Sequence, residues 1–161
     1  MKRFFLSHGL VVAAAVCATA PAIAPSYYAE GSVWRETDPR LPRLLHFLKV
    51  NECPSVEFAQ EFLEEADAHD LDWRLLPSIS LLESGGGREA RNNNIFGWDS
   101  GNASFPSVRA GIHYVANQLS NSELYREKDL DGILHTYNPG AGYADRVKSL
   151  MARLSPADSS E

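Results

Sequence analysis

Glu83 stands at the end of a predicted helix, where a carboxylic acid is well placed to act as a general acid. A mainly apolar stretch, residues 71–82, precedes it, and Gly85, Gly86 and Gly87 follow closely. A carboxylate in the last turn of a helix meets the negative end of the helix dipole, and apolar neighbours cost it solvation. Both effects favour the protonated form that a general acid needs. The alternative is a solvated glutamate at a helix end.

A polar and aromatic run, residues 92–98, follows the glycines. Amide side chains such as Asn94 bond to hydroxyl and acetamido groups, and aromatic rings such as Phe96 and Trp98 stack on sugar rings. We therefore predict a sugar-binding wall here. The alternatives are that loop asparagines bond their own backbone and that the aromatic residues belong to the core.

A second possible wall surrounds the glycine-rich turn at residues 138–142. Tyr137, Asn138 and Tyr143 flank this turn and carry hydroxyl and amide groups that a ligand could meet. Both tyrosines also fit the apolar faces of the helices on either side, so the core is the alternative place for them.

The elements that position these residues are predicted to be helical. A short helix is expected over residues 42–50, and Asp72 and Asp129 are candidate helix caps. Asp99-Ser100-Gly101-Asn102 is a turn signal, and it predicts a small β-hairpin of residues 95–98 and 103–105. The fold class is therefore mainly α, with one small hairpin beside the cleft. Apolar residues at helical spacing mark the longer helices: Ala59, Phe62, Leu63 and Ala66; Leu76 and Ile79; Val108, Ile112, Val115 and Leu119; Leu130, Ile133, Leu134 and Tyr137; Tyr143, Val147, Leu150 and Leu154.

The N-terminus has the pattern of a cleaved secretory signal over residues 1–24. Lys2 and Arg3 precede an apolar run that is too short to span a bilayer, and small residues end it. Cleavage after Ala18 is an alternative, and lipidation of Cys17 is a weaker match. Residues 25–53 are predicted to be a leader with a short helix, 54–154 the domain and 155–161 a polar tail. The protein is expected to be secreted or periplasmic, with no transmembrane helix.

Charge and cysteine content exclude several classes of function. The formal charge is −6, and loss of Lys2 and Arg3 with the signal would make it −8, which disfavours nucleic-acid binding. Cys53 would remain as a single thiol, so neither a disulfide nor a cysteine zinc site is expected. The histidines lack the spacing of a His-Glu-x-x-His motif, and we expect them on helix surfaces or rims. No metal and no cofactor are predicted.

Five short motifs, in order over about residues 54–154, resemble the bacterial glucosaminidase family of peptidoglycan hydrolases in the lysozyme-like superfamily. A further segment, residues 137–140, is similar to the "YN-x-G" segment of soluble lytic transglycosylases, a neighbouring family with the same fold. The motifs are the glutamate-bearing helix and its glycines, residues 75–87; an "NN-x-FG" element, Asn93-Asn94-Ile95-Phe96-Gly97; Phe105-Pro106-Ser107; Tyr125; and Tyr143-Ala144-Asp145-Arg146-Val147.

The resemblance implies a lysozyme-like fold and cleavage of β-1,4 linkages next to N-acetylated sugars, with Glu83 as general acid. It also implies that Ser84 orients the acid and that Tyr137 and Tyr143 contact substrate or support the transition state. Glycan strands of peptidoglycan are the expected partner, beside unidentified envelope proteins.

The second catalytic group stays open. Asp99 is a candidate second carboxylate, and a tyrosine is another candidate. Assistance by the substrate acetamido group and intramolecular capture, as in a lytic transglycosylase, need one enzyme carboxylate only. A muramidase, or a domain that binds glycan without cutting it, is the remaining alternative.

Overall fold

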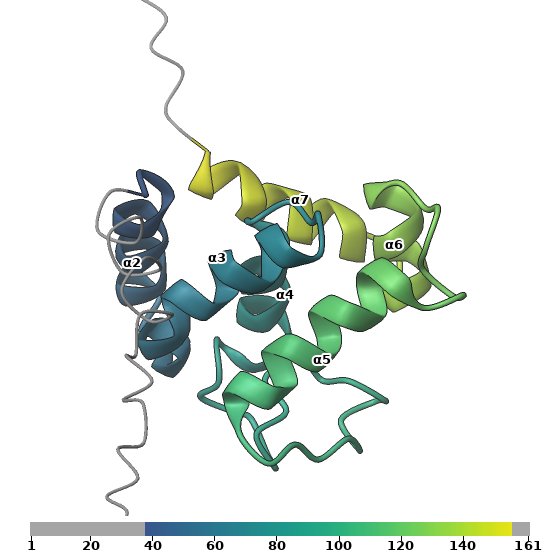
Figure 1. The fold of residues 1–161 in the computed structure, drawn as a ribbon, viewed down its shortest axis with the longest axis horizontal. Coiled ribbons are helices and arrows are strands. Elements are labelled where there is room, and N and C mark those ends of the chain that lie inside the picture. Colours follow the sequence, from purple (N-terminus) through teal and green to yellow (C-terminus); the bar gives the residue numbers. More distant parts are fainter. Residues whose placement is uncertain (1–37, 156–161) are drawn as a thin grey trace, which may run out of the picture.

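The structure is a computed structural model that describes residues 38–155 (Figure 1). The predicted signal over residues 1–24, residues 25–37 of the leader and residues 156–161 of the tail lie outside the described residues. The described chain is mainly helical, as predicted. Its helices are α2 (Arg40–Val50), the 3-10 helix η2 (Pro54–Phe58), α3 (Ala59–Ala68), α4 (Leu75–Ser84), α5 (Val108–Asn121), α6 (Leu130–Tyr137) and α7 (Tyr143–Leu154). Among residues 38–155, no helix has the length and apolar character needed to cross a membrane.

Helix α4 lies in the middle of the fold, packed between α3 and α7 (Figure 1). Residues 75–80 are buried in succession, so this helix is enclosed on nearly all sides and carries Glu83 out of the core at its end. Pro77 fits because it lies in the first turn, where backbone N–H groups have no partner within the helix. Burial of α4 fixes the position from which Glu83 emerges.

The glycines behind Glu83 end α4 and allow it to pack closely. Gly85 adopts a left-handed conformation at φ 61°, and its N–H donates to Leu81 O at 3.0 Å, as in many helix ends. At Gly86 a Cβ atom would lie 2.4 Å from Cys53 Sγ, so only glycine fits there. The residue that packs closely against Gly86 is therefore Cys53 of the same chain, and not a ligand.

Helix α2 shares the core of the domain. Leu44, Phe47 and Leu48 are buried, and α2 packs on α3, η2 and α7. The short helix was expected over residues 42–50, and it begins two residues earlier. Residues 40–50 therefore pack as part of the domain, although the sequence grouped them with the leader.

The predicted β-hairpin is wrong: no strand occurs within residues 38–155, and the one isolated bridge there joins Arg91 to Asn94. Asp99 and Ser100 adopt left-handed φ values of 54° and 52°, so the predicted turn is present although the strands are not. In addition, the Asn94 side chain donates to Trp98 O at 3.0 Å and accepts from Trp98 N at 2.9 Å. Trp98 O also accepts from Ala103 N at 3.3 Å, but Trp98 N–H donates to the Asn94 side chain in place of a carbonyl across the loop, so residues 95–105 fold as a loop of successive turns.

The last helices match the expected apolar faces. Ile112, Val115 and Leu119 of α5 are buried. The Asp129 side chain accepts from Gly132 N at 2.8 Å, which confirms it as the cap of α6. On α7 the buried positions include Tyr143 and Val147, and this helix lies along α4. Tyr143 is thereby brought beside the end of α4.

Candidate active site

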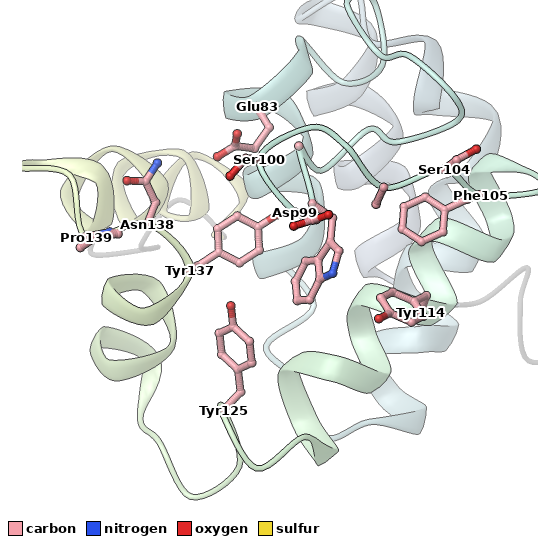
Figure 2. Close-up of a pocket in the computed structure, with 13 residues that line it drawn as sticks. Glu83, Asp99, Ser100, Ser104, Phe105, Tyr114, Tyr125, Tyr137, Asn138 and Pro139 are labelled. Atoms are coloured by element: carbon pink, nitrogen blue, oxygen red, sulfur yellow. The ribbon is translucent and has the colours of Figure 1, made fainter.

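A cavity of about 960 Å³ opens at the end of α4, between the loop of residues 97–105 and the connection from α6 to α7 (Figure 2). Helix α5 contributes to its far side. The lining residues are Glu83, Gly97, Trp98, Asp99, Ser100, Ala103, Ser104, Phe105, Tyr114, Tyr125, Tyr137, Asn138 and Pro139. This part of the structure is a cleft of the size that ligand sites have.

Glu83 lies half-buried in the cavity wall, and its two carboxylate oxygens have different neighbours. The Tyr143 hydroxyl donates to Oε1 at 2.8 Å. Oε2 lies against Gly97, where a Cβ atom would approach it to 2.7 Å. Oε1 is therefore held by Tyr143 of α7. Oε2 lies beneath the loop of residues 97–105, which lines the cavity.

Two stacked tyrosines support this arrangement. The rings of Tyr137 and Tyr143 are nearly parallel, at 10°, with centroids 6.0 Å apart. The Tyr137 hydroxyl donates to the Phe96 carbonyl oxygen at 2.5 Å. Burial, and then the neighbouring Tyr143 and Glu83, hold the pKa of Tyr137 well above its usual value. Burial and the hydrogen bond to Glu83 likewise raise the pKa of Tyr143, so both hydroxyls stay protonated as donors.

Aromatic rings form the remaining wall around Trp98. Its ring centroid lies 5.6 Å from Tyr137, 6.1 Å from Tyr125 and 6.0 Å from Tyr114. The Tyr114 ring is 43% exposed, and it also contacts Phe105, with centroids 5.5 Å apart. Such a wall offers ring faces and hydroxyl groups to a ligand that is partly apolar and rich in hydrogen-bonding groups.

The loop that carries Trp98 is held by bonds from residues behind it. Besides the two bonds between Asn94 and Trp98, the Ser84 hydroxyl donates to Ile95 O at 2.7 Å. The Asn93 side chain donates to Phe105 O at 2.8 Å. These bonds connect the loop to the end of α4, so the acid and the aromatic wall are fixed in one framework.

The predicted site residues divide into two groups. Glu83, Tyr137 and Asn138 line the cavity, and Tyr143 lies behind Glu83 with its ring buried. The other three are buried and do not line it: Ser84 bonds Ile95, Asn94 bonds Trp98, and Phe96 packs edge-on against Phe62 at 6.4 Å. The side chains of Ser84, Asn94 and Phe96 therefore support the loop of residues 95–105 from inside the protein.

Several lining residues were not chosen from the sequence as site residues. Gly97 appeared only as part of a motif, and its role depends on contact with Glu83. Tyr114 carried a detectable signal, because it lies off the apolar face of α5 formed by Ile112 and Val115. Because Tyr114 contacts both Trp98 and Phe105, it belongs to a continuous aromatic surface of the kind that marks a binding site.

Asp99 lines the same cavity as Glu83, and it is exposed at a left-handed turn position. Among residues 38–155, these two carboxylates are the charged side chains of the lining, and no Lys, Arg or His lines it. A cavity without a cation offers no charge partner to phosphate or to another anion. It fits an uncharged polar ligand better.

Comparison of the chain with protein families, with curated proteins and with solved structures found no match.

Proposed function

We propose that the protein is a glycosidase of peptidoglycan that cleaves β-1,4 linkages next to N-acetylated sugars, with Glu83 as the general acid. The observation that carries the proposal is the place of Glu83: half-buried at the wall of the cavity, with Tyr143 bonded to Oε1. On this proposal the domain is a lysozyme-like helical fold, and it acts in the periplasm or outside the cell.

The different neighbours of the two Glu83 oxygens suggest which oxygen would carry the proton and donate it to the substrate. Because Oε1 accepts from Tyr143, the proton of neutral Glu83 would sit on Oε2. From there it passes to the glycosidic oxygen as the bond from that oxygen to the anomeric carbon breaks. The leaving sugar keeps the proton, and the positive charge develops on the anomeric carbon and ring oxygen of the other sugar.

The aromatic wall supports a glycan as substrate. Trp98, Tyr114 and Tyr125 present rings and hydroxyl groups to the cavity, and Asn138 presents an amide. Sugar rings have apolar faces that stack on aromatic rings and hydroxyl edges that bond to polar groups. No Lys, Arg or His of residues 38–155 lines the cavity, which supports the glycan backbone, rather than a phosphorylated sugar, as the bound part.

The fate of the glycosyl cation depends on a second group. Asp99 lines the cavity and would serve as a base or nucleophile in a two-carboxylate mechanism. Its exposed, turn-bound position favours instead a reaction with one enzyme carboxylate, in which the substrate's own acetamido or hydroxyl group attacks. A lytic transglycosylase is therefore the second candidate function, and it yields an anhydro sugar in place of a new reducing end.

Digestion of purified peptidoglycan tests the proposal. The full chain is expected to release soluble glycan fragments, and mass spectrometry separates reducing-end products from anhydro products, which are lighter by one water. The identity of the terminal sugar distinguishes a glucosaminidase from a muramidase. Binding to peptidoglycan with no fragments released over long incubation would contradict the enzyme and support a glycan-binding domain.

A further inference from the structure

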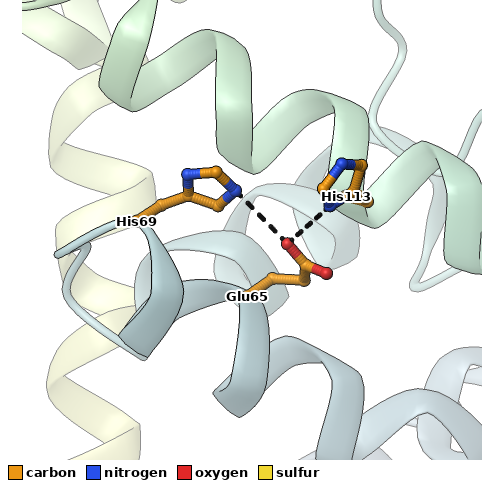
Figure 3. A group of neighbouring side chains, drawn as sticks. All are labelled: Glu65, His69 and His113. Atoms are coloured by element: carbon orange, nitrogen blue, oxygen red, sulfur yellow. Dashed lines mark hydrogen bonds and ion pairs between the residues drawn. The ribbon is translucent and has the colours of Figure 1, made fainter.

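A second group of side chains with ligand chemistry lies between α3 and α5, among residues that do not line the cavity. Glu65 belongs to α3, His69 is its C-cap residue, and His113 belongs to α5 (Figure 3). Their nearest ligand atoms all lie within 4.8 Å of one another. We call these three residues the Glu-His-His cluster.

The separations within the cluster suit one shared ion. Glu65 Oε2 lies 3.4 Å from His69 Nε2 and 3.0 Å from His113 Nδ1. In tetrahedral coordination with bonds of about 2.0–2.1 Å, neighbouring ligand atoms are roughly 3.4 Å apart. Two of the three separations between ligand atoms, from Glu65 Oε2 to each histidine nitrogen, are therefore close to this value. Figure 3 shows both imidazole rings turned toward the carboxylate. The third separation, between the two histidine nitrogens, is no longer than 4.8 Å, and the exposed His113 side chain would have to move to shorten it to the tetrahedral value.

The backbone positions of the cluster are well supported. Glu65 and His69 are four residues apart, so they lie on the same side of α3. Helices α3 and α5 pack on each other, and Arg109 of α5 forms an ion pair with Glu61 of α3. Asn121 lies against the other ring nitrogen of His69, with Nδ2 at 3.3 Å from Nδ1. When Nε2 binds a metal ion, Nδ1 carries the ring proton, so the Asn121 amide must turn to present its oxygen to Nδ1–H.

We propose that the Glu-His-His cluster binds a divalent transition-metal ion of the zinc class. Two imidazole nitrogens and one carboxylate oxygen are ligands that Zn²⁺ prefers, whereas Mg²⁺ and Ca²⁺ prefer oxygen alone. The cluster is open to solvent at His113, whose side chain is 63% exposed, while His69 is 12% exposed. The ion enters from that side and keeps one position for water.

The bound ion would connect two helices that are far apart in the sequence. Glu65 and His113 are separated by 48 residues, so the unfolded chain does not hold these ligands together. An ion that binds only the folded chain stabilises it by mass action. The cluster therefore acts as a structural clamp between α3 and α5, and this role does not depend on the proposed glycosidase activity.

Calorimetric titration of the metal-free full chain with ZnCl₂ tests the proposal. We expect one tight site and, at a hundredfold excess over Kd, a rise in Tm of roughly 5–10 °C. His113→Gln removes one ligand at an exposed position, where folding is preserved, and is expected to weaken binding by roughly a hundredfold or more. His135→Gln, which removes an exposed histidine outside the cluster, is the matched control and should bind as the wild type does.

Cobalt substitution provides a second measurement that does not depend on stability. Co²⁺ bound by the cluster should give the intense visible absorption of four- or five-coordinate cobalt, and Glu65→Gln should abolish it. Equal zinc affinity in the wild type and His113→Gln would overturn the proposal. A weak spectrum of hydrated, octahedral cobalt would overturn it as well, and would leave the cluster as a hydrogen-bonded group only.

Discussion

Gly97 lies so close to Glu83 that a Cβ atom at position 97 would be 2.7 Å from Glu83 Oε2. Gly97 also has a left-handed φ of 62°, which glycine adopts without strain. The loop of residues 95–105, which we call the cleft loop, therefore passes directly over the candidate acid, and the absence of a side chain at position 97 leaves room for the Glu83 carboxylate.

Gly97→Ala should consequently displace the Glu83 carboxylate and reduce glycan cleavage at least about tenfold, because misplacement of a catalytic group by an ångström is that costly. The strained φ should also lower the free energy of unfolding by roughly 1–2 kcal/mol. Fragment release from peptidoglycan and urea unfolding measure the two effects.

Gly101→Ala is the matched control for that variant. Gly101 lies in the same loop at φ 84°, but a Cβ there would meet nothing within 4 Å. It should lose a similar amount of stability and keep its activity. Equal activity loss in both variants would show that strain in the loop, and not contact with Glu83, is responsible.

Tyr143→Phe tests whether the hydrogen bond to Glu83 Oε1 positions the acid. The ring and its stacking on Tyr137 are kept, and only the donor at 2.8 Å is removed. A hydrogen bond to a charged group contributes about 1.5–3 kcal/mol, so kcat should fall roughly 10–100-fold with little change in KM. If kcat of the folded Tyr143→Phe variant equals that of the wild type, Tyr143 has no positioning role.

Alkaline pH should destabilise the protein through the buried tyrosines. Burial raises the pKa of Tyr137 and of Tyr143 above the ordinary value of 10.0. A pKa that is higher in the folded than in the unfolded state gives stability that is complete below pH 10 and is lost as the pH rises further. Ultraviolet titration should therefore show that some of the six tyrosines ionise only on unfolding. A single reversible phase near pH 10 with unchanged circular dichroism would contradict this.

Asn94→Ala should loosen the cleft loop. Asn94 is 4% exposed, and the change removes both of its bonds to the Trp98 backbone. The loss should lower the free energy of unfolding by about 2 kcal/mol. It should also reduce activity, because Gly97 and Trp98 would no longer be fixed beside Glu83. Asn102→Ala, at an exposed position of the same loop, should change neither quantity, and an equally harmless Asn94→Ala would refute the role of Asn94.

The helices could be predicted because their signals are local. Apolar spacing marked Phe62 and Leu63 on α3, and the glycine after Ser84 marked the end of α4. Those local signals alone predict that Glu83 lies at the end of a helix. The part of the site that depends on helix periodicity was therefore accessible from the sequence.

The conformation of the loop of residues 95–105 and the contacts between residues distant in the sequence could not be predicted from such local signals. The hairpin prediction failed because the Trp98 N–H donates to the Asn94 side chain in place of a backbone carbonyl, and a turn signal does not reveal such competition. The pairing of Tyr143 with Glu83 spans 60 residues and depends on α7 packing along α4. The Glu-His-His cluster was missed for the same reason, since His113 joins it from another helix.

Replacement of the candidate acid is the most direct test of the central claim. Glu83→Gln keeps the size and the acceptor for Tyr143 but removes the transferable proton, so folding and binding to peptidoglycan should be retained. We predict that fragment release from purified peptidoglycan falls by roughly a hundredfold or more, the scale of general acid catalysis. Undiminished release by a folded Glu83→Gln variant would contradict the assignment of Glu83 as the catalytic acid.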